Sequence, residues 1–250
     1  MPPGRKLKIK MENKMSHYVL VHGAFEGSWS WENITPELTK NGHEVTVVDL
    51  PGSPGNKRII PEVTMEGYVD AVVGAISKLE RQVVLVGHSM AGAVISQVAE
   101  LIPEKIERLV YVTAFLLKDG DSVLEAMQRD AAGQFLPRLA FADDQSSATS
   151  DEATWREVAF HDVDEPSILE ALPLLRGPQA TEPFMAKVNV TDERFGTVPK
   201  TYIRTDIDKM LTPTLQDEMV ENWKVDQIHV LNSGHFPAMS VPKQLASAML

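Results

Sequence analysis

A serine lies in a tight turn between an apolar strand and a helix of small residues, and in this setting it could act as a nucleophile. The strand is predicted over residues 83–86, and the turn follows as Gly87-His88-Ser89-Met90-Ala91-Gly92. This is the layout of a nucleophile elbow, which holds the serine oxygen above the edge of a sheet. Ala91 departs from the Gly-x-Ser-x-Gly spacing but is small enough for the turn. The N–H groups of the following helix would stabilise an oxyanion, so we predict acyl-transfer chemistry at Ser89.

A serine hydroxyl needs a general base, and the base needs a group that orients it. His235 is favoured among the seven histidines because it follows the last predicted strand, residues 227–231. Parallel sheets place reacting groups in such loops. The orienting acid should follow a strand between the serine and the histidine in chain order. Asp206 and Asp208 both follow a strand that ends at Arg204, and spacing alone leaves the choice between them open.

The oxyanion of such a reaction would require two backbone N–H donors. One is expected from Met90, and the other from Ala24 in the loop after the first predicted strand, where Gly23 allows close backbone approach. We interpret His22 and His88 as hydrogen-bonding residues that hold these loops in place rather than as additional bases.

Alternating strands and helices must position these groups, and they predict an α/β fold with a parallel sheet covered on both faces. The predicted strands are residues 18–21, 44–50, 83–86, 106–115, 200–204 and 227–231, and the predicted helices lie between and after them. Residues 116–196 interrupt the alternation with short helical pieces and no strand signal, which predicts a helical lid over the site. Residues 17–115 and 197–250 would form the core, and residues 1–16 a disordered extension.

Composition excludes several classes of protein. The 250 residues are 43% hydrophobic and 24% charged, as in globular proteins, and the absence of cysteine excludes disulfides and thiolate sites. A net charge of −11 argues against nucleic acid or an anionic membrane surface as partner. No apolar stretch is long enough to span a membrane, and residues 1–16 lack the apolar centre of a secretory signal. We therefore expect a cytoplasmic protein.

The chain resembles the α/β-hydrolase fold, and more closely the group of plant methylesterases, hydroxynitrile lyases and related bacterial carboxylesterases. The resemblance is carried by residues 18–25, 27–31, 48–52, 87–92 and 111–115, and by Gly234-His235 with Met239 following. It implies a mostly parallel sheet with helices on both faces. It also implies that the catalytic aspartate is the second acid of Thr205-Asp206-Ile207-Asp208, which selects Asp208, and that Ala24 and Met90 supply the oxyanion donors.

The resemblance and the residues together predict a carboxylic ester hydrolase that forms an acyl-enzyme at Ser89. The related lyases carry a lysine directly after the catalytic histidine, where this chain has Phe236. The expected substrate is a small to medium apolar or aromatic ester, bound by residues including Phe25, Phe115, Trp155 and Phe236, with no metal or cofactor. A lyase or cofactor-free oxygenase on the same scaffold, and a non-catalytic small-ligand binding protein, remain alternatives. A homodimer is left open.

Overall fold

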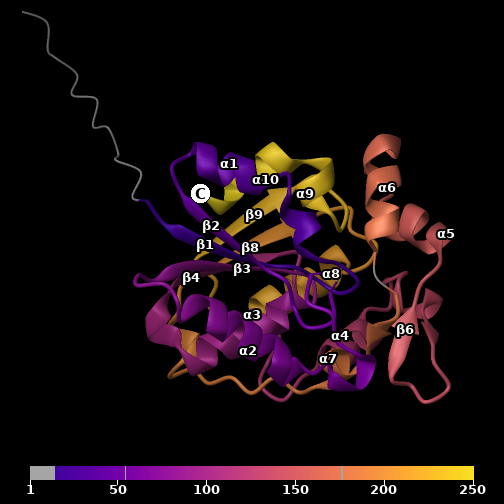
Figure 1. The fold of residues 1–250 in the computed structure, drawn as a ribbon, viewed down its shortest axis with the longest axis horizontal. Coiled ribbons are helices and arrows are strands. Elements are labelled where there is room, and N and C mark those ends of the chain that lie inside the picture. The colour runs from indigo at the N-terminus through magenta and orange to yellow at the C-terminus, as the bar shows by residue number, and fades with distance from the viewer. Residues whose placement is uncertain (1–14, 54, 176) are drawn as a thin grey trace, which may run out of the picture.

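A six-stranded sheet, in which all neighbouring strands run parallel, forms the centre of the protein (Figure 1). The computed structural model describes residues 15–53, 55–175 and 177–250. The strand order is β2-β1-β3-β4-β8-β9. The strands are β1 (His17–Val21), β2 (Glu44–Val48), β3 (Val83–His88), β4 (Ile106–Val112), β8 (Lys200–Thr205) and β9 (Gln227–Leu231). The predicted α/β class is confirmed. Residues 1–14, most of the predicted extension, lie outside the described residues.

The sheet is covered on both faces because successive side chains of a strand point to opposite sides. In β1, Tyr18 and Leu20 enter one apolar cluster, and Val19 and Val21 enter the other. Helices α1, α9 and α10 lie on one face, and α2, α3 and α8 on the other (Figure 1). Their bounds are α1 (Thr35–Lys40), α2 (Met65–Ile76), α3 (Ala91–Leu101), α8 (Pro213–Glu221), α9 (Pro237–Ser240) and α10 (Pro242–Met249). None of the described helices is long and apolar enough to cross a membrane.

Local signals account for several element boundaries. Thr64 caps α2 as predicted, since its side chain accepts a hydrogen bond from the N–H of Gly67. All six residues of β3 are buried, as expected of an inner strand of a parallel sheet. Short turns of 3₁₀ helix complete the connections: η1 (Ser28–Trp31), η2 (Ile60–Glu62), η3 (Pro103–Lys105), η4 (Leu136–Arg138), η6 (Leu172–Leu174) and η7 (Phe195–Thr197).

The segment from residue 116 to 196, here called the insert, differs from the prediction because it contains strands. A three-stranded antiparallel sheet joins β5 (Ala140–Phe141), β6 (Ser147–Thr149) and β7 (Gln179–Ala180). Strands of two or three residues are too short to show an alternating pattern. The helices of the insert are α4 (Val123–Arg129), α5 (Glu152–Thr154), the π-helical turn η5 (Trp155–Ala159), α6 (Glu165–Ala171) and α7 (Glu182–Met185). Figure 1 shows α5, α6 and β6 at one side of the central sheet.

Candidate active site

Ser89 occupies a strained turn between β3 and α3. Its φ angle of 54° lies in the left-handed region that residues other than glycine rarely adopt. The turn is held by hydrogen bonds from the N–H of Ser89 to the carbonyl of Val112 (3.3 Å) and from the N–H of Phe115 to the carbonyl of Ser89 (3.1 Å). This is the elbow that the sequence predicts, and it places the hydroxyl at the carboxyl edge of the sheet.

Two glycines make this elbow possible through close packing. A Cβ atom on Gly87 would lie 2.8 Å from the carbonyl oxygen of Ala91, and one on Gly92 would lie 2.6 Å from the backbone of Phe115. Any side chain at either position would therefore push α3 or its neighbouring loop away. Ala91 itself is completely buried, so the missing glycine of the usual spacing is replaced by a residue that still fits.

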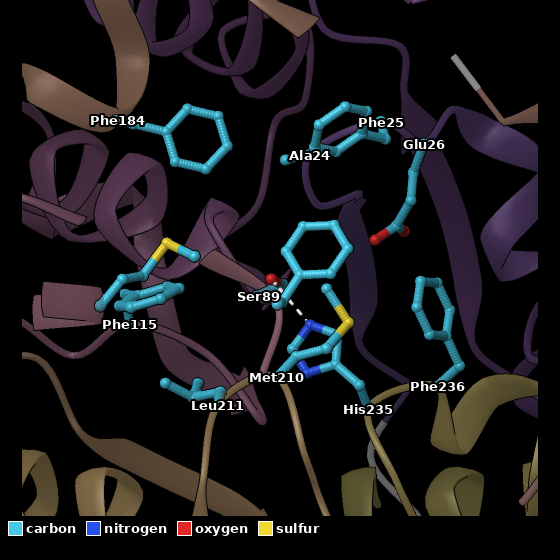
Figure 2. A pocket seen from close by; sticks show the side chains of 12 residues that line it. Ala24, Phe25, Glu26, Ser89, Phe115, Phe184, Met210, Leu211, His235 and Phe236 are labelled. Carbon is cyan, nitrogen blue, oxygen red and sulfur yellow. Dashed lines mark hydrogen bonds between the residues drawn. The ribbon is translucent and has the colours of Figure 1, made fainter. Parts of the chain in front are cut away.

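A chain of hydrogen bonds joins Ser89, His235 and Asp208, which come from loops after β3, β9 and β8. His235 Nε2 lies 2.9 Å from Ser89 Oγ (Figure 2), and His235 Nδ1 lies 2.7 Å from Asp208 Oδ2. Because the carboxylate accepts the Nδ1 proton, Nε2 is left to accept the serine proton. The three parallel strands end at the same edge of the sheet, which brings together residues far apart in the sequence.

The carboxylate of Asp208 is buried and fully hydrogen-bonded. Its Oδ2 also accepts from the hydroxyls of Thr113 (2.7 Å) and Thr205 (3.2 Å), and its Oδ1 accepts from the N–H groups of Met210 and Leu211. Burial opposes its ionisation, but electrostatic attraction to His235 and these hydrogen bonds outweigh burial and lower the pKa of Asp208.

Asp206, the competing acid, is exposed. Of the two candidate acids, it is Asp208 that contacts His235 in the structure, as the resemblance implied.

The loop after β1 places Ala24 beside Ser89 in the wall of a cavity. The backbone N–H groups of Ala24 and Met90 have no hydrogen-bond acceptor among residues 15–53, 55–175 and 177–250. His22 holds this loop, since its Nδ1 donates to the carbonyl of Gly23 (2.8 Å) and its Nε2 accepts from the N–H of Leu50 (3.1 Å). These contacts match the role predicted for His22.

His88 forms a buried ion pair with Glu26, a residue that the sequence analysis did not single out. His88 Nδ1 lies 2.9 Å from Glu26 Oε1, and His88 Nε2 lies 2.8 Å from the carbonyl oxygen of His235. Burial opposes the charge on both partners, but their mutual attraction outweighs it. The pKa of His88 is consequently raised and that of Glu26 lowered. His88 is thus a structural hydrogen-bonding residue, as predicted.

A cavity opens over Ser89 and His235 (Figure 2). Its apolar lining includes three of the predicted pocket residues, Phe25, Phe115 and Phe236. Trp155, the fourth, is not part of the lining: it packs behind the wall, with its ring 5.4 Å from that of Phe25. The sequence analysis missed Glu26, Met127, Phe135, Phe184, Met210 and Leu211.

Position along the chain could have pointed to three of the missed residues. Met210 and Leu211 lie two and three residues after Asp208, and Glu26 follows the Ala24 loop. The other three, Met127, Phe135 and Phe184, come from the insert, which has no pattern that indicates which side chains face the cavity.

No group of histidine, aspartate and glutamate side chains in the described part of the chain could hold a metal ion.

Residues 18–248 match the alpha/beta hydrolase family, and the chain belongs to that family. Within the family it falls in the methylesterase-like group. It is 28% identical to methyl jasmonate esterase 1 of Vitis vinifera, over 95% of this chain and 96% of that protein. It is 29% identical to putative methylesterase 11, chloroplastic, of Arabidopsis thaliana, over 97% of this chain but only 65% of that relative. Among solved structures, polyneuridine aldehyde esterase is similar with a TM-score of 0.84 and 25% identity, over 94% of this chain and 98% of that one.

Proposed function

We propose that this protein is a serine esterase that hydrolyses small to medium carboxylic esters with apolar or aromatic groups. The class of enzyme, a carboxylic ester hydrolase, agrees with its methylesterase relatives. The observation that carries the serine mechanism is the hydrogen-bonded series from Ser89 through His235 to Asp208 at the floor of an apolar cavity. Each member has the donor or acceptor that its role requires.

The reaction would proceed by double displacement. His235 Nε2 takes the proton of Ser89 Oγ as the oxygen attacks the ester carbonyl, and the oxyanion accepts hydrogen bonds from the N–H groups of Ala24 and Met90. The tetrahedral intermediate expels the alcohol, which receives the proton from His235, and leaves an acyl-enzyme. Water then repeats the sequence, releases the acid and restores the serine. Asp208 holds the tautomer of His235 and stabilises the imidazolium.

The lining of the cavity favours hydrolysis over cyanohydrin cleavage. Departing cyanide would need a cation to stabilise it, but the described residues that line the cavity include no lysine or arginine. Phe236 occupies the position after His235 and packs its ring 5.2 Å from that of His88. An apolar acyl or alcohol group would instead gain from contact with the aromatic walls.

We further propose that the insert acts as a lid on a core formed by residues 17–115 and 197–250. Met127, Phe135 and Phe184 of the insert supply part of the cavity wall. Gln179 anchors the insert to the core, since its Oε1 accepts a hydrogen bond from the N–H of Phe25 at 3.0 Å. A substrate that fills the cavity would therefore contact both parts of the chain.

The proposal is tested by turnover of p-nitrophenyl and aryl methyl esters by the wild type and by Ser89→Ala. Hydrolysis should be abolished in the variant. A sulfonyl fluoride should inactivate the wild type and label the peptide that contains Ser89, as mass spectrometry would detect. Ester hydrolysis that survives in Ser89→Ala would overturn the serine mechanism.

A further inference from the structure

Glu26 contributes a buried carboxylate to the lining of the cavity, and one of its two oxygens has no partner among the described residues. The residue is only 2% exposed, yet it lines the cavity together with Ser89 and His235, and Figure 2 shows its carboxylate directed toward these residues. Its Oε1 accepts the hydrogen bond from His88. Its Oε2 is buried and has no hydrogen-bond partner among the residues that the structure describes.

The contacts of His88 favour a charged carboxylate at Glu26. Both ring nitrogens of His88 face acceptors, Glu26 Oε1 and the carbonyl oxygen of His235. The pKa of His88 is raised and that of Glu26 lowered, which agrees with a ring that carries both protons and is neutralised by Glu26. His88 engages one oxygen of the carboxylate and leaves the other with its lone pairs. A buried polar atom without a partner is costly, and one in the wall of a binding cavity is best explained by a ligand that satisfies it.

Glu26 also lies close to the reacting atoms. A Cβ atom on Gly23 would be 2.5 Å from Glu26 Oε1, the oxygen bound to His88, and 3.0 Å from Ser89 Cβ, so the carboxylate group and the serine both lie next to Gly23. In the proposed reaction the leaving oxygen faces His235, which must protonate it. The other substituent of the carbonyl, the α-carbon of the acyl group, is then the part of the substrate free to face Glu26.

We propose that Glu26 determines substrate specificity by accepting, at Oε2, a hydrogen bond from a hydroxyl or N–H group on the acyl carbon next to the ester carbonyl. The preferred substrates are then esters of α-hydroxy acids, or of acids with an α-N–H donor, that carry an apolar group. This inference rests on the proposed esterase function and names the acyl group that the site selects.

The test compares two esters that differ only in the donor: methyl mandelate and its O-methyl ether, methyl α-methoxyphenylacetate. Because hydrogen bonds to charged groups are strong, the wild type should prefer the hydroxy ester in kcat/KM by about tenfold. Glu26→Gln should abolish or reverse the preference, since its amide oxygen would face His88 and its NH₂ group would donate toward the ether oxygen. The ratio is measured on one preparation, so loss of folded protein cancels. Equal preference in the wild type and Glu26→Gln would overturn the inference.

A matched variant and a binding measurement complete the test. Glu62→Gln, which changes an exposed glutamate paired with Arg58, should keep the wild-type ratio. Ser89→Ala binds without turnover, so its Kd values for the two esters report on Glu26 independently of hydrolysis. If the wild type hydrolyses neither ester, the esterase proposal is overturned, while a tighter Kd of Ser89→Ala for the hydroxy ester would still support the Glu26 contact. Equal Kd values would overturn the contact even if hydrolysis occurs.

Discussion

The imidazole of His88 donates a hydrogen bond to the backbone carbonyl of His235 at 2.8 Å, across 147 positions of sequence. The residue before the proposed nucleophile thereby holds the backbone of the proposed base. The other ring nitrogen of His88 binds Glu26. A single buried ion pair thus connects the Ala24 loop, the elbow and the His235 loop.

Removal of one partner of this ion pair should be more damaging than removal of both. His88→Gln leaves the charge of Glu26 buried and unpaired, which should lower the free energy of unfolding by about 3–5 kcal/mol. The double variant Glu26→Gln/His88→Gln should lose less stability than His88→Gln alone, and therefore less than the sum of the two single variants. Urea unfolding measures both. His229→Gln, at a half-buried position of β9, is the control and should change stability by less than about 0.5 kcal/mol. Additive losses would contradict a coupled pair.

The ion pair should also make stability depend on pH. The pKa of His88 is raised above its ordinary value of 6.5 in the folded state. The folded state therefore keeps this proton when the unfolded state releases it, and stability falls as pH rises. The stabilisation is complete below about pH 6.5 and is lost as pH rises through the folded pKa.

Urea unfolding of the wild type and of Glu26→Gln/His88→Gln from pH 5.5 to 9 would measure this effect. The advantage of the wild type should shrink above pH 6.5. Lys200, whose pKa burial lowers to about 8, acts in the opposite direction but is common to both proteins. An advantage that stays constant over this range would contradict a raised pKa of His88.

Asp208 and Asp206 offer a matched test of the orienting acid. Asp208→Asn replaces an acceptor of the His235 proton with an amide that favours the wrong tautomer, so kcat should fall by roughly 10³- to 10⁴-fold. Asp206→Asn, two residues earlier and exposed, should keep nearly all activity. Steady-state kinetics on a p-nitrophenyl ester measures both. Similar losses in the two variants would remove Asp208 from the proposed mechanism.

Close packing at Gly92 predicts a large effect of one added methyl group. Gly92→Ala would force the backbone of Phe115 away from α3, since the new atom would lie 2.6 Å from it. Thermal unfolding should show a loss of about 1–3 kcal/mol. Gly74→Ala in α2, with nothing within 4 Å of the added atom, should instead stabilise the protein by about 0.5–1 kcal/mol. Equal changes in stability in the two variants would show that helix propensity, not packing, determines the effect of Gly92→Ala.

Phe184 lines both the cavity over Ser89 and a second apolar cavity in the insert, as does Met127. Phe184→Ala should join them and raise the kcat/KM ratio of p-nitrophenyl octanoate to butyrate by about tenfold, because the longer chain buries additional CH₂ groups. Phe141→Ala changes a residue that lines the second cavity but not the cavity over Ser89 and is the control. An unchanged ratio in Phe184→Ala would show that the cavities stay separate.

The sequence by itself determined the features that depend on neighbouring residues. The apolar strands, the turn at Ser89 and the position of His235 after a strand are local patterns, and the parallel order of the strands brings their ends to one edge. The resemblance then selected Asp208 over Asp206. This choice agrees with the structure, in which Asp208 contacts His235.

Tertiary structure alone decided which side chains meet across long distances in the chain. The pairing of Glu26 with His88 spans 62 positions, and nothing near either residue indicates it. Trp155 looked like a cavity residue by its type, yet packing places it behind Phe25. The short strands of the insert and its contribution to the cavity could likewise not be predicted from the sequence. Its elements are too short to carry a periodic signal, so the packing of the whole chain determines which of its side chains face the site.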